Sequence, residues 1–205
     1  IPVIEDPEER IRWIWEEEYQ NVFPDQVHDQ MPDAQRESPV MEKTNRMLDD
    51  LRKGAVANLP VAASVAAYGS VLGMLAAQKG VTWGQLLAMN LSVFAGSAQF
   101  VMVEMWAPPL PVVEMTLAVM IINLRYLLIG ASLNPLFQGK SLAHRAGVMH
   151  WVADENWAVT MAAHRSGGAS SMFLLGGGLC LCSVWSMGTL MGHQLGALIA
   201  RPERL

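Results

Sequence analysis

The sequence predicts an all-α fold, a polytopic helical membrane protein with four to five membrane segments, some of them re-entrant or broken. Three observations support this fold class. The chain is 52% hydrophobic and its mean hydropathy is +0.24, both above the usual range of soluble domains. Several uncharged apolar runs are long enough to cross the roughly 30 Å hydrocarbon layer at 1.5 Å per residue. Small and polar residues interrupt some of these runs, which indicates segments that do not face lipid.

The N-terminal segment differs from the rest of the chain in charge. Residues 1–50 contain fourteen acids and five bases and carry −9, whereas residues 51–205 contain five acids and nine bases and carry +4. We therefore expect an acidic polar segment over 1–50 and a transmembrane domain over 51–205. The nine later bases are scattered, so no nucleic-acid surface is expected. Met41 resembles an ordinary start, which makes residues 1–40 an expected extension before it.

The apolar runs define the expected membrane segments. The first, AVANLPVAASVAAYGSVLGMLAA, covers residues 55–77 and carries no charge. The others cover 83–106, 112–133, 149–163 and 172–200, and the run over 149–163 is weaker because Asp154 and Glu155 interrupt it. The first and last runs are apolar around the whole helix, which disfavours a soluble helical bundle with amphipathic stripes.

Two runs carry glycines at four-residue spacing. Gly69-x-x-x-Gly73 lies in the first run, and Gly188-x-x-x-Gly192-x-x-x-Gly196 lies in the last. Such flat faces allow close helix approach in a membrane, where no hydrophobic effect drives helices together. The spacing leaves open whether these faces pack inside the chain or against another subunit.

The stretch SVFAGSAQF lies inside the second apolar run. On a continuous helix its small and polar residues share one narrow face, which suits a cavity because buried polar atoms are costly in hydrocarbon. These residues are Ser92, Ala95, Gly96 and Gln99. Gly96 and Ser97 also allow a local break, which would free backbone groups at membrane depth as in discontinuous transporter helices.

Charged residues stand inside two other runs. Arg125 interrupts the third run, and each charge facing lipid would cost about 2.5–3.5 kcal/mol, so we expect Arg125, Asp154 and Glu155 to face the interior. A functional site and an Arg–carboxylate pair that only joins two helices both remain open. His150 and Asp154 are four residues apart, but no second histidine stands at ligand spacing. We therefore expect no metal site and no cofactor.

The distribution of bases predicts orientation. Lys43, Arg46, Arg52 and Lys53 precede the first run and place the N-terminus in the cytoplasm, and Lys140 with Arg145 should lie on the same side. Three full crossings between these groups would put them on opposite sides of the membrane. We therefore predict that 83–106 is re-entrant and bent near 95–97.

Three motifs, SVFAGSAQF, NLRYLLIGASLNP and ADENWAV, resemble in order and spacing the AzlC-type branched-chain amino-acid permeases. The likeness covers about residues 50–200. It implies a multi-pass protein of the bacterial inner membrane, with no enzymatic activity, that exports amino acids such as valine using the proton motive force. It also implies a small hydrophobic partner subunit of the AzlD type. Family members usually continue with further apolar helices, so the alternative is a truncated, non-transporting copy or a packing subunit.

The resemblance implies a site for an aliphatic zwitterion. Arg125 is then the candidate for the substrate carboxylate, and Asp154 or Glu155 for the ammonium group or a coupling proton, with Phe94, Phe100 and Trp157 as walls. The candidate substrate-binding or proton-coupling residues are Ser92, Gly96, Ser97, Gln99, Asn123, Arg125, Asp154 and Glu155.

Overall fold

The computed structural model describes residues 39–199, so the predicted extension over 1–40 lies almost entirely outside the described residues. The chain divides into two units, Ile1–Asn45 and Arg46–Leu205, and the following account concerns the second. The described residues form these helices, of which the first begins before the second unit does: α3 (Pro39–Gln78), α4 (Trp83–Ser92), α5 (Gly96–Glu104), α6 (Val112–Asn123), α7 (Arg125–Leu133), η3 (Asn134–Phe137), α8 (Leu142–Met149), α9 (Asp154–Arg165) and α10 (Ser171–Ile199).

Three segments of the described residues are long and apolar enough to cross a membrane. They are Val40–Gln78, Val112–Phe137 and Ser171–Leu198, and they correspond to the first, third and last predicted runs. The predicted all-α membrane fold is confirmed. The remaining two predicted segments have a different form.

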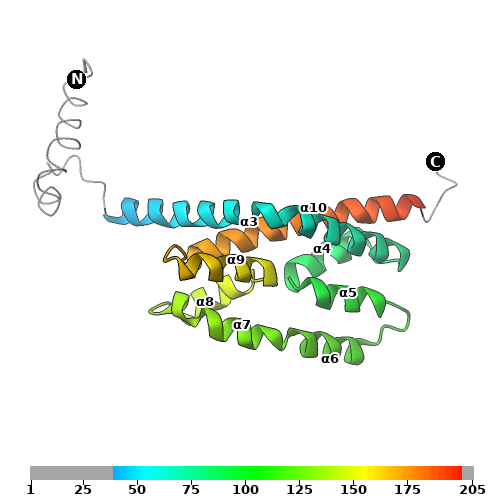
Figure 1. The fold of residues 1–205 in the computed structure, drawn as a ribbon. Helices are drawn as coiled ribbons and strands as arrows, with labels where there is room; N and C mark the ends of the chain where they lie inside the picture. The colour runs from blue at the N-terminus through cyan, green and yellow to red at the C-terminus, as the bar shows by residue number, and fades with distance from the viewer. Residues whose placement is uncertain (1–38, 200–205) are drawn as a thin grey trace, which may run out of the picture. The chain divides into compact units, whose positions relative to one another are not determined.

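The runs over 83–106 and 149–163 do not give single spanning helices. Helices α4 and α5 make up most of the first, separated by Val93–Ala95, and a break over 150–153 separates α9 from α8. Each pair forms a hairpin, and Figure 1 shows the two hairpins between the α3–α10 pair and the α6–α7 span.

The α4–α5 hairpin enters and leaves the bundle at the same end. Lys79 lies just before α4, and Glu104 is the last residue of α5. The distance between Lys79 Nζ and Glu104 Oε2 is 3.3 Å, and the same Nζ donates to the Glu104 carbonyl at 3.1 Å. The segment therefore turns back on itself within the bundle, and its re-entrance into a membrane stays a prediction. Its break lies at Val93–Ala95, slightly earlier than the predicted bend.

The α8–α9 hairpin enters from the opposite end. His144 lies in the first turn of α8, and Ser171 is the first residue of α10, which follows α9. The distance between His144 Nε2 and Ser171 Oγ is 3.1 Å. The tips of the two hairpins meet inside the bundle. His150 Nε2 lies 2.8 Å from the Leu91 carbonyl oxygen, and the rings of Phe94 and Trp151 are 6.5 Å apart between centroids.

The α3–α10 pair is built on the predicted glycine faces. A Cβ atom at Gly73 would collide with the Thr189 carbonyl, and one at Gly192 would collide with the Ser70 carbonyl. A Cβ at Gly188 would meet the backbone of Ala66 in the same way. The glycines of α3 therefore pack against α10, and those of α10 pack against α3. Of the two alternatives that the sequence left open, packing inside the chain is the one observed, rather than packing against another subunit.

The hydrophobic core consists of two clusters that flank the hairpin tips. One joins α3, α4, α5 and α10 through buried residues such as Leu72, Leu86 and Leu181. The other joins α7, η3, α8 and α10 through residues such as Leu133, Phe137 and Leu174. A pocket with charged and apolar lining residues lies beside these clusters.

Candidate binding pocket

The pocket lies where the two hairpin tips approach the α6–α7 span. It has a volume of about 120 Å³, close to that of the roughly 150 Å³ engineered cavity that binds benzene, so its size suits a small solute. Its lining residues are Val65, Tyr68, Phe94, Gly96, Ser97, Arg125, Tyr126, Ala153, Asp154, Glu155, Leu181 and Trp185.

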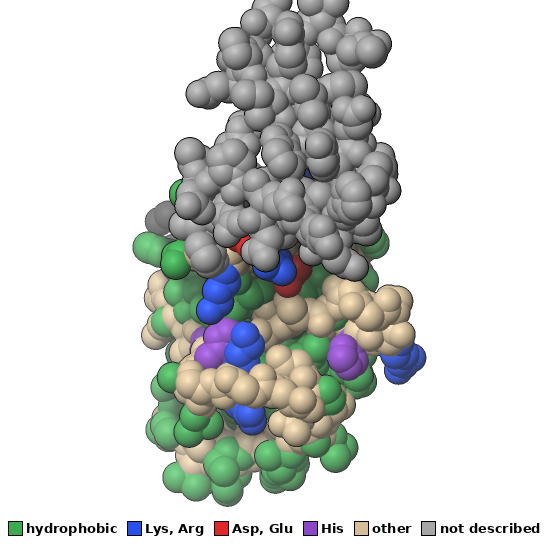
Figure 2. Space-filling model, turned by 90° about the vertical axis from the view of Figure 1, so that its left-hand side faces the viewer, with side chains coloured by type: hydrophobic (Ala, Val, Ile, Leu, Met, Phe, Trp, Pro, Cys, Tyr) green, Lys and Arg blue, Asp and Glu red, His purple; other side chains and the backbone are tan. Residues whose placement is uncertain are grey.

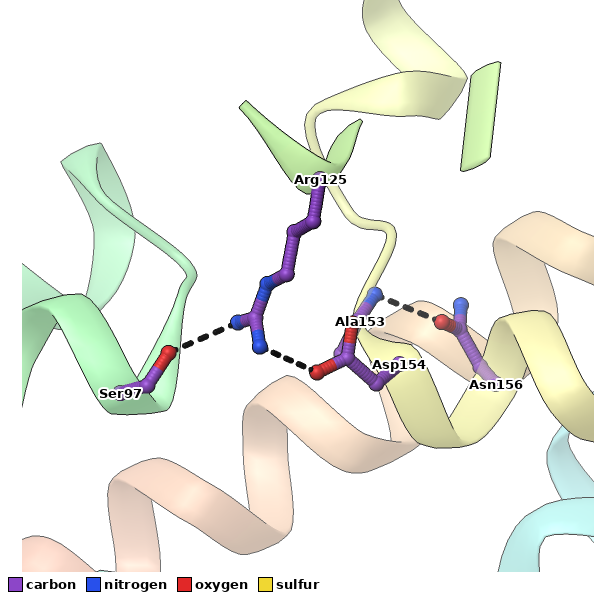
Figure 3. Close-up of polar contacts among 5 residues, drawn as sticks. All are labelled: Ser97, Arg125, Ala153, Asp154 and Asn156. Carbon is purple, nitrogen blue, oxygen red and sulfur yellow. Dashed lines mark hydrogen bonds and ion pairs between the residues drawn. The ribbon is translucent and has the colours of Figure 1, made fainter. Parts of the chain in front are cut away.

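Arg125 occupies the polar part of this pocket and joins both hairpins. Its Nη1 lies 2.7 Å from Asp154 Oδ2 at the start of α9, and its Nη2 donates to Ser97 Oγ in α5 at 2.8 Å (Figure 3). The Arg125 and Asp154 side chains are 35% and 44% exposed, so the ion pair is open to a ligand. The Tyr126 ring lies beside the guanidinium, with its centroid 5.3 Å from Cζ.

A local irregularity in the third span precedes Arg125. Leu124 separates α6 from α7, and its N–H donates to the Ile121 carbonyl while its own carbonyl accepts from Leu127 N–H. Both bonds have the three-residue spacing of a tightened turn. The spanning segment is thus interrupted beside the same pocket as the two hairpins.

The pocket also receives two helix N-termini. Gly96 and Ser97 form the first turn of α5, and Asp154 and Glu155 form the first turn of α9. The residue before each helix, Ala95 or Ala153, has no side chain that could accept from the N–H groups of this turn. Free N–H groups and the positive end of the helix dipole favour a negative group at both positions. Together with Arg125, they make this part of the pocket suited to a carboxylate.

The α9 terminus is fixed by a buried amide. Asn156 Oδ1 accepts from the Ala153 N–H at 2.7 Å (Figure 3), and its Nδ2 donates to the carbonyls of Trp151 and Leu174, each at 3.2 Å. The side chain is fully buried. Asn156 therefore holds the break before α9 against α10 and sets the position of Asp154.

The other part of the pocket is apolar. Val65 and Tyr68 come from α3, Leu181 and Trp185 come from α10, and Phe94 comes from the first hairpin tip. A site with charged groups beside an apolar wall can hold a small molecule that is ionic at one end and hydrophobic at the other.

The structure brings five of the eight predicted site residues into the pocket: Gly96, Ser97, Arg125, Asp154 and Glu155. Ser92, Gln99 and Asn123 do not line it. The prediction that Ser92 shares a helical face with Gly96 and Gln99 is wrong, because α4 ends at Ser92 and helical periodicity does not continue across the break. Ser92 is exposed, and its Oγ donates to the carbonyl of Ala88 in its own helix.

The other two residues have different surroundings. Asn123 ends α6, and its buried Oδ1 has no hydrogen-bond partner among the described residues. Gln99 is fully buried beside the pocket rather than in its wall.

Of the three predicted wall residues, only Phe94 lines the pocket. Phe100 stacks on Tyr68 with 4.7 Å between ring centroids, and Trp157 donates through Nε1 to Ser132 Oγ at 2.8 Å within the second cluster. The sequence analysis missed Tyr126, Tyr68 and Trp185. Tyr126 follows Arg125 in the motif and could have been found there, whereas the others come from distant helices with no local signal.

This arrangement defines a class of protein. Interrupted helices that meet around a charged pocket, between helices long enough to span a membrane, are the architecture of membrane transporters. The class does not by itself define what is carried.

The chain belongs to the AzlC family, since the model of that family, described as AzlC protein, matches residues 60–199. This confirms the resemblance seen in the three motifs. The family comprises membrane transporters of branched-chain amino acids that work with a partner subunit. Membership is consistent with a protein that is not an enzyme. Comparisons with curated proteins and with solved structures find no match.

Proposed function

We propose that this chain binds a branched-chain aliphatic amino acid between its two hairpin tips and exports it across the bacterial inner membrane. The observation that carries the proposal is the position of Arg125, which lies between two uncapped helix N-termini and beside an apolar wall. An amino acid such as valine or leucine is a zwitterion with an apolar side chain, so it needs all three features.

The substrate carboxylate binds Arg125 in place of the Asp154 carboxylate. A guanidinium can hold a carboxylate through two parallel hydrogen bonds, and the N-termini of α5 and α9 favour negative charge at the same place. The exposed fractions of Arg125 and Asp154, 35% and 44%, support this exchange because a ligand can reach both side chains. In the absence of substrate, the Asp154 carboxylate then occupies the position on Arg125 that the substrate carboxylate takes.

The substrate ammonium group binds a carboxylate of the α9 N-terminus. Glu155 lines the pocket and makes no ion pair with any described residue, so it is available for this role. Asp154 becomes available when the substrate carboxylate occupies Arg125. One of these two carboxylates takes up the proton whose movement drives export.

The bases at one end of the unit support an orientation with that end in the cytoplasm. Lys140, Arg145 and Arg165 lie where α8 begins and α9 ends, and Figure 2 shows Lys and Arg side chains on this end. At the other end, Lys79 is paired with Glu104. The start of α3 then faces the cytoplasm, and the proposed partner is a small hydrophobic subunit of the AzlD type.

Ligand analogues test the proposal directly. The full chain in lipid nanodiscs is titrated with leucine, with leucinamide, which lacks the carboxylate, and with 4-methylpentanoate, which lacks the ammonium group. Each analogue loses charge-assisted hydrogen bonds worth about 1.5–3 kcal/mol, so each should bind at least about tenfold more weakly than leucine. Equal binding of leucinamide and leucine would contradict a carboxylate site at Arg125.

Export needs its own measurement. The chain is co-reconstituted with its AzlD-type partner in vesicles loaded with labelled leucine, and an imposed proton gradient should accelerate release. An equal rate of leucine release with and without the gradient would contradict proton coupling. It would not contradict the proposed binding site.

A further inference from the structure

Trp185 forms a large part of the apolar wall and is tightly packed there. It is 5% exposed, lies on α10 and lines the pocket. On one side the indole lies against Gly96, where an added Cβ would come within 3.1 Å of Cη2. On another side the Tyr68 ring lies 6.1 Å from it between centroids. Neighbours therefore hold the ring at the first residue of α5.

Gln99 fixes the orientation of this ring. Its Oε1 accepts from Trp185 Nε1 at 2.8 Å, and both side chains are buried. Its Nε2 donates to the Val93 carbonyl at 2.6 Å and to the Met89 carbonyl at 3.3 Å. Both N–H groups and the carbonyl of the amide are thus used. Gln99 thus links the Met89 and Val93 carbonyls, at the α4–α5 break, to the pocket wall.

We propose that Trp185 sets the size limit for the substrate side chain, and that Gln99 is the positioning residue that holds Trp185 in place. This inference rests on the proposed function, since it names the specificity determinant of the same pocket. A rigid aromatic wall discriminates by size because it cannot move aside without breaking the buried indole–amide hydrogen bond. A flexible aliphatic side chain at this position would yield more readily.

Two variants with opposite effects test the role of Trp185. Trp185→Phe removes part of the wall, so the affinity for phenylalanine relative to valine should rise by about tenfold. Gly96→Ala adds a methyl group between α5 and the indole, so the same ratio should fall. General damage to the protein would not move the ratio in opposite directions. The ratio is measured by competition against labelled leucine with the full chain in nanodiscs.

Trp157→Phe is the matched control. It also removes an interior indole that donates to a side chain, here Ser132 Oγ, but Trp157 does not line the pocket. The affinity ratio should stay at the wild-type value in this variant. A ratio that changes as much as in Trp185→Phe would contradict the role of Trp185.

A double-mutant cycle tests the role of Gln99. Gln99→Met removes both the acceptor for Trp185 and the donors to the break, and it should raise the phenylalanine-to-valine ratio in the wild type. In the Trp185→Phe background it should add little, because the residue through which Gln99 acts is already changed. Fully additive effects would show that Gln99 acts independently of Trp185 and would overturn its assignment.

The outcomes separate the two proposals. Wild-type protein that binds none of valine, leucine and isoleucine would overturn the proposed function, and this inference with it. Wild-type protein that binds them, with ratios unchanged in both Trp185→Phe and Gly96→Ala, would overturn only this inference. If Trp185→Phe fails to fold, the Gly96→Ala variant alone is sufficient. An unchanged phenylalanine-to-valine ratio in that variant would overturn this inference.

Discussion

At the scale of single residues, the pocket depends on a charge placed in an apolar span. Arg125 is held by one charged partner, Asp154, and one neutral partner, Ser97. Removing the acid leaves a positive charge inside the bundle without its counter-ion, which is costly. Glu155, the next residue, makes no ion pair with the described residues. The two neighbouring acids should therefore respond differently to neutralisation.

We predict that Asp154→Asn lowers the free energy of unfolding by about 1–3 kcal/mol, between the values for exposed and buried pairs because this pair is partly exposed. Glu155→Gln should leave stability within about 0.5 kcal/mol of wild type but weaken leucine binding. Chemical unfolding in detergent and leucine titration measure the two effects. Equal loss of stability in both variants would contradict the distinct roles of the two acids.

At the scale of helices, close packing of α3 and α10 supports the hairpins. The two helices approach each other at glycines whose Cβ positions are filled by the opposing backbone. In contrast, a Cβ atom at Gly84 in α4 would meet no atom within 4 Å. The chain thus contains a matched pair of glycines, one at the helix contact and one outside it.

We predict that Gly192→Ala destabilises the fold by about 1–3 kcal/mol, because its Cβ collides with the Ser70 carbonyl. Gly84→Ala should be neutral or stabilise by up to about 1 kcal/mol, since alanine is the better helix former. Thermal unfolding in detergent compares the two. Equal stability of the two variants would show that the α3–α10 contact is looser than described.

The re-entrant hairpin gives a prediction about sidedness. Gln78 and Ala107 flank the α4–α5 hairpin and are both exposed, whereas Gln138 is exposed near the opposite end. In a background without Cys180 and Cys182, single cysteines at Gln78 and Ala107 should react with an impermeant thiol reagent from the same side. A cysteine at Gln138 should react from the other side. Labelling of Gln78 and Ala107 from opposite sides would contradict a re-entrant segment.

At the scale of the whole unit, the sequence predicted the positions of the three long apolar helices, because the hydropathy of a run depends on its local composition alone. The two other expected segments are broken helices. An argument on charge predicted that 83–106 is bent, and polar residues in apolar runs pointed to Arg125, Asp154 and Ser97. The prediction that Ser92 shares a helical face with Gly96 and Gln99 was wrong, because it applied helical spacing across the break between α4 and α5. Trp185 and Tyr68 could not be predicted, because their place in the pocket depends on how α3 and α10 pack.

The central claim is that Arg125 holds the carboxylate of an amino acid, and leucine titration of two matched variants tests it most directly. Arg125→Lys keeps the charge but loses the planar fork, so leucine should bind at least about tenfold more weakly. Arg145→Lys, which changes an arginine bonded to the Phe137 and Lys140 carbonyls outside the pocket, should bind leucine as wild type does. Undiminished binding by Arg125→Lys would contradict the account.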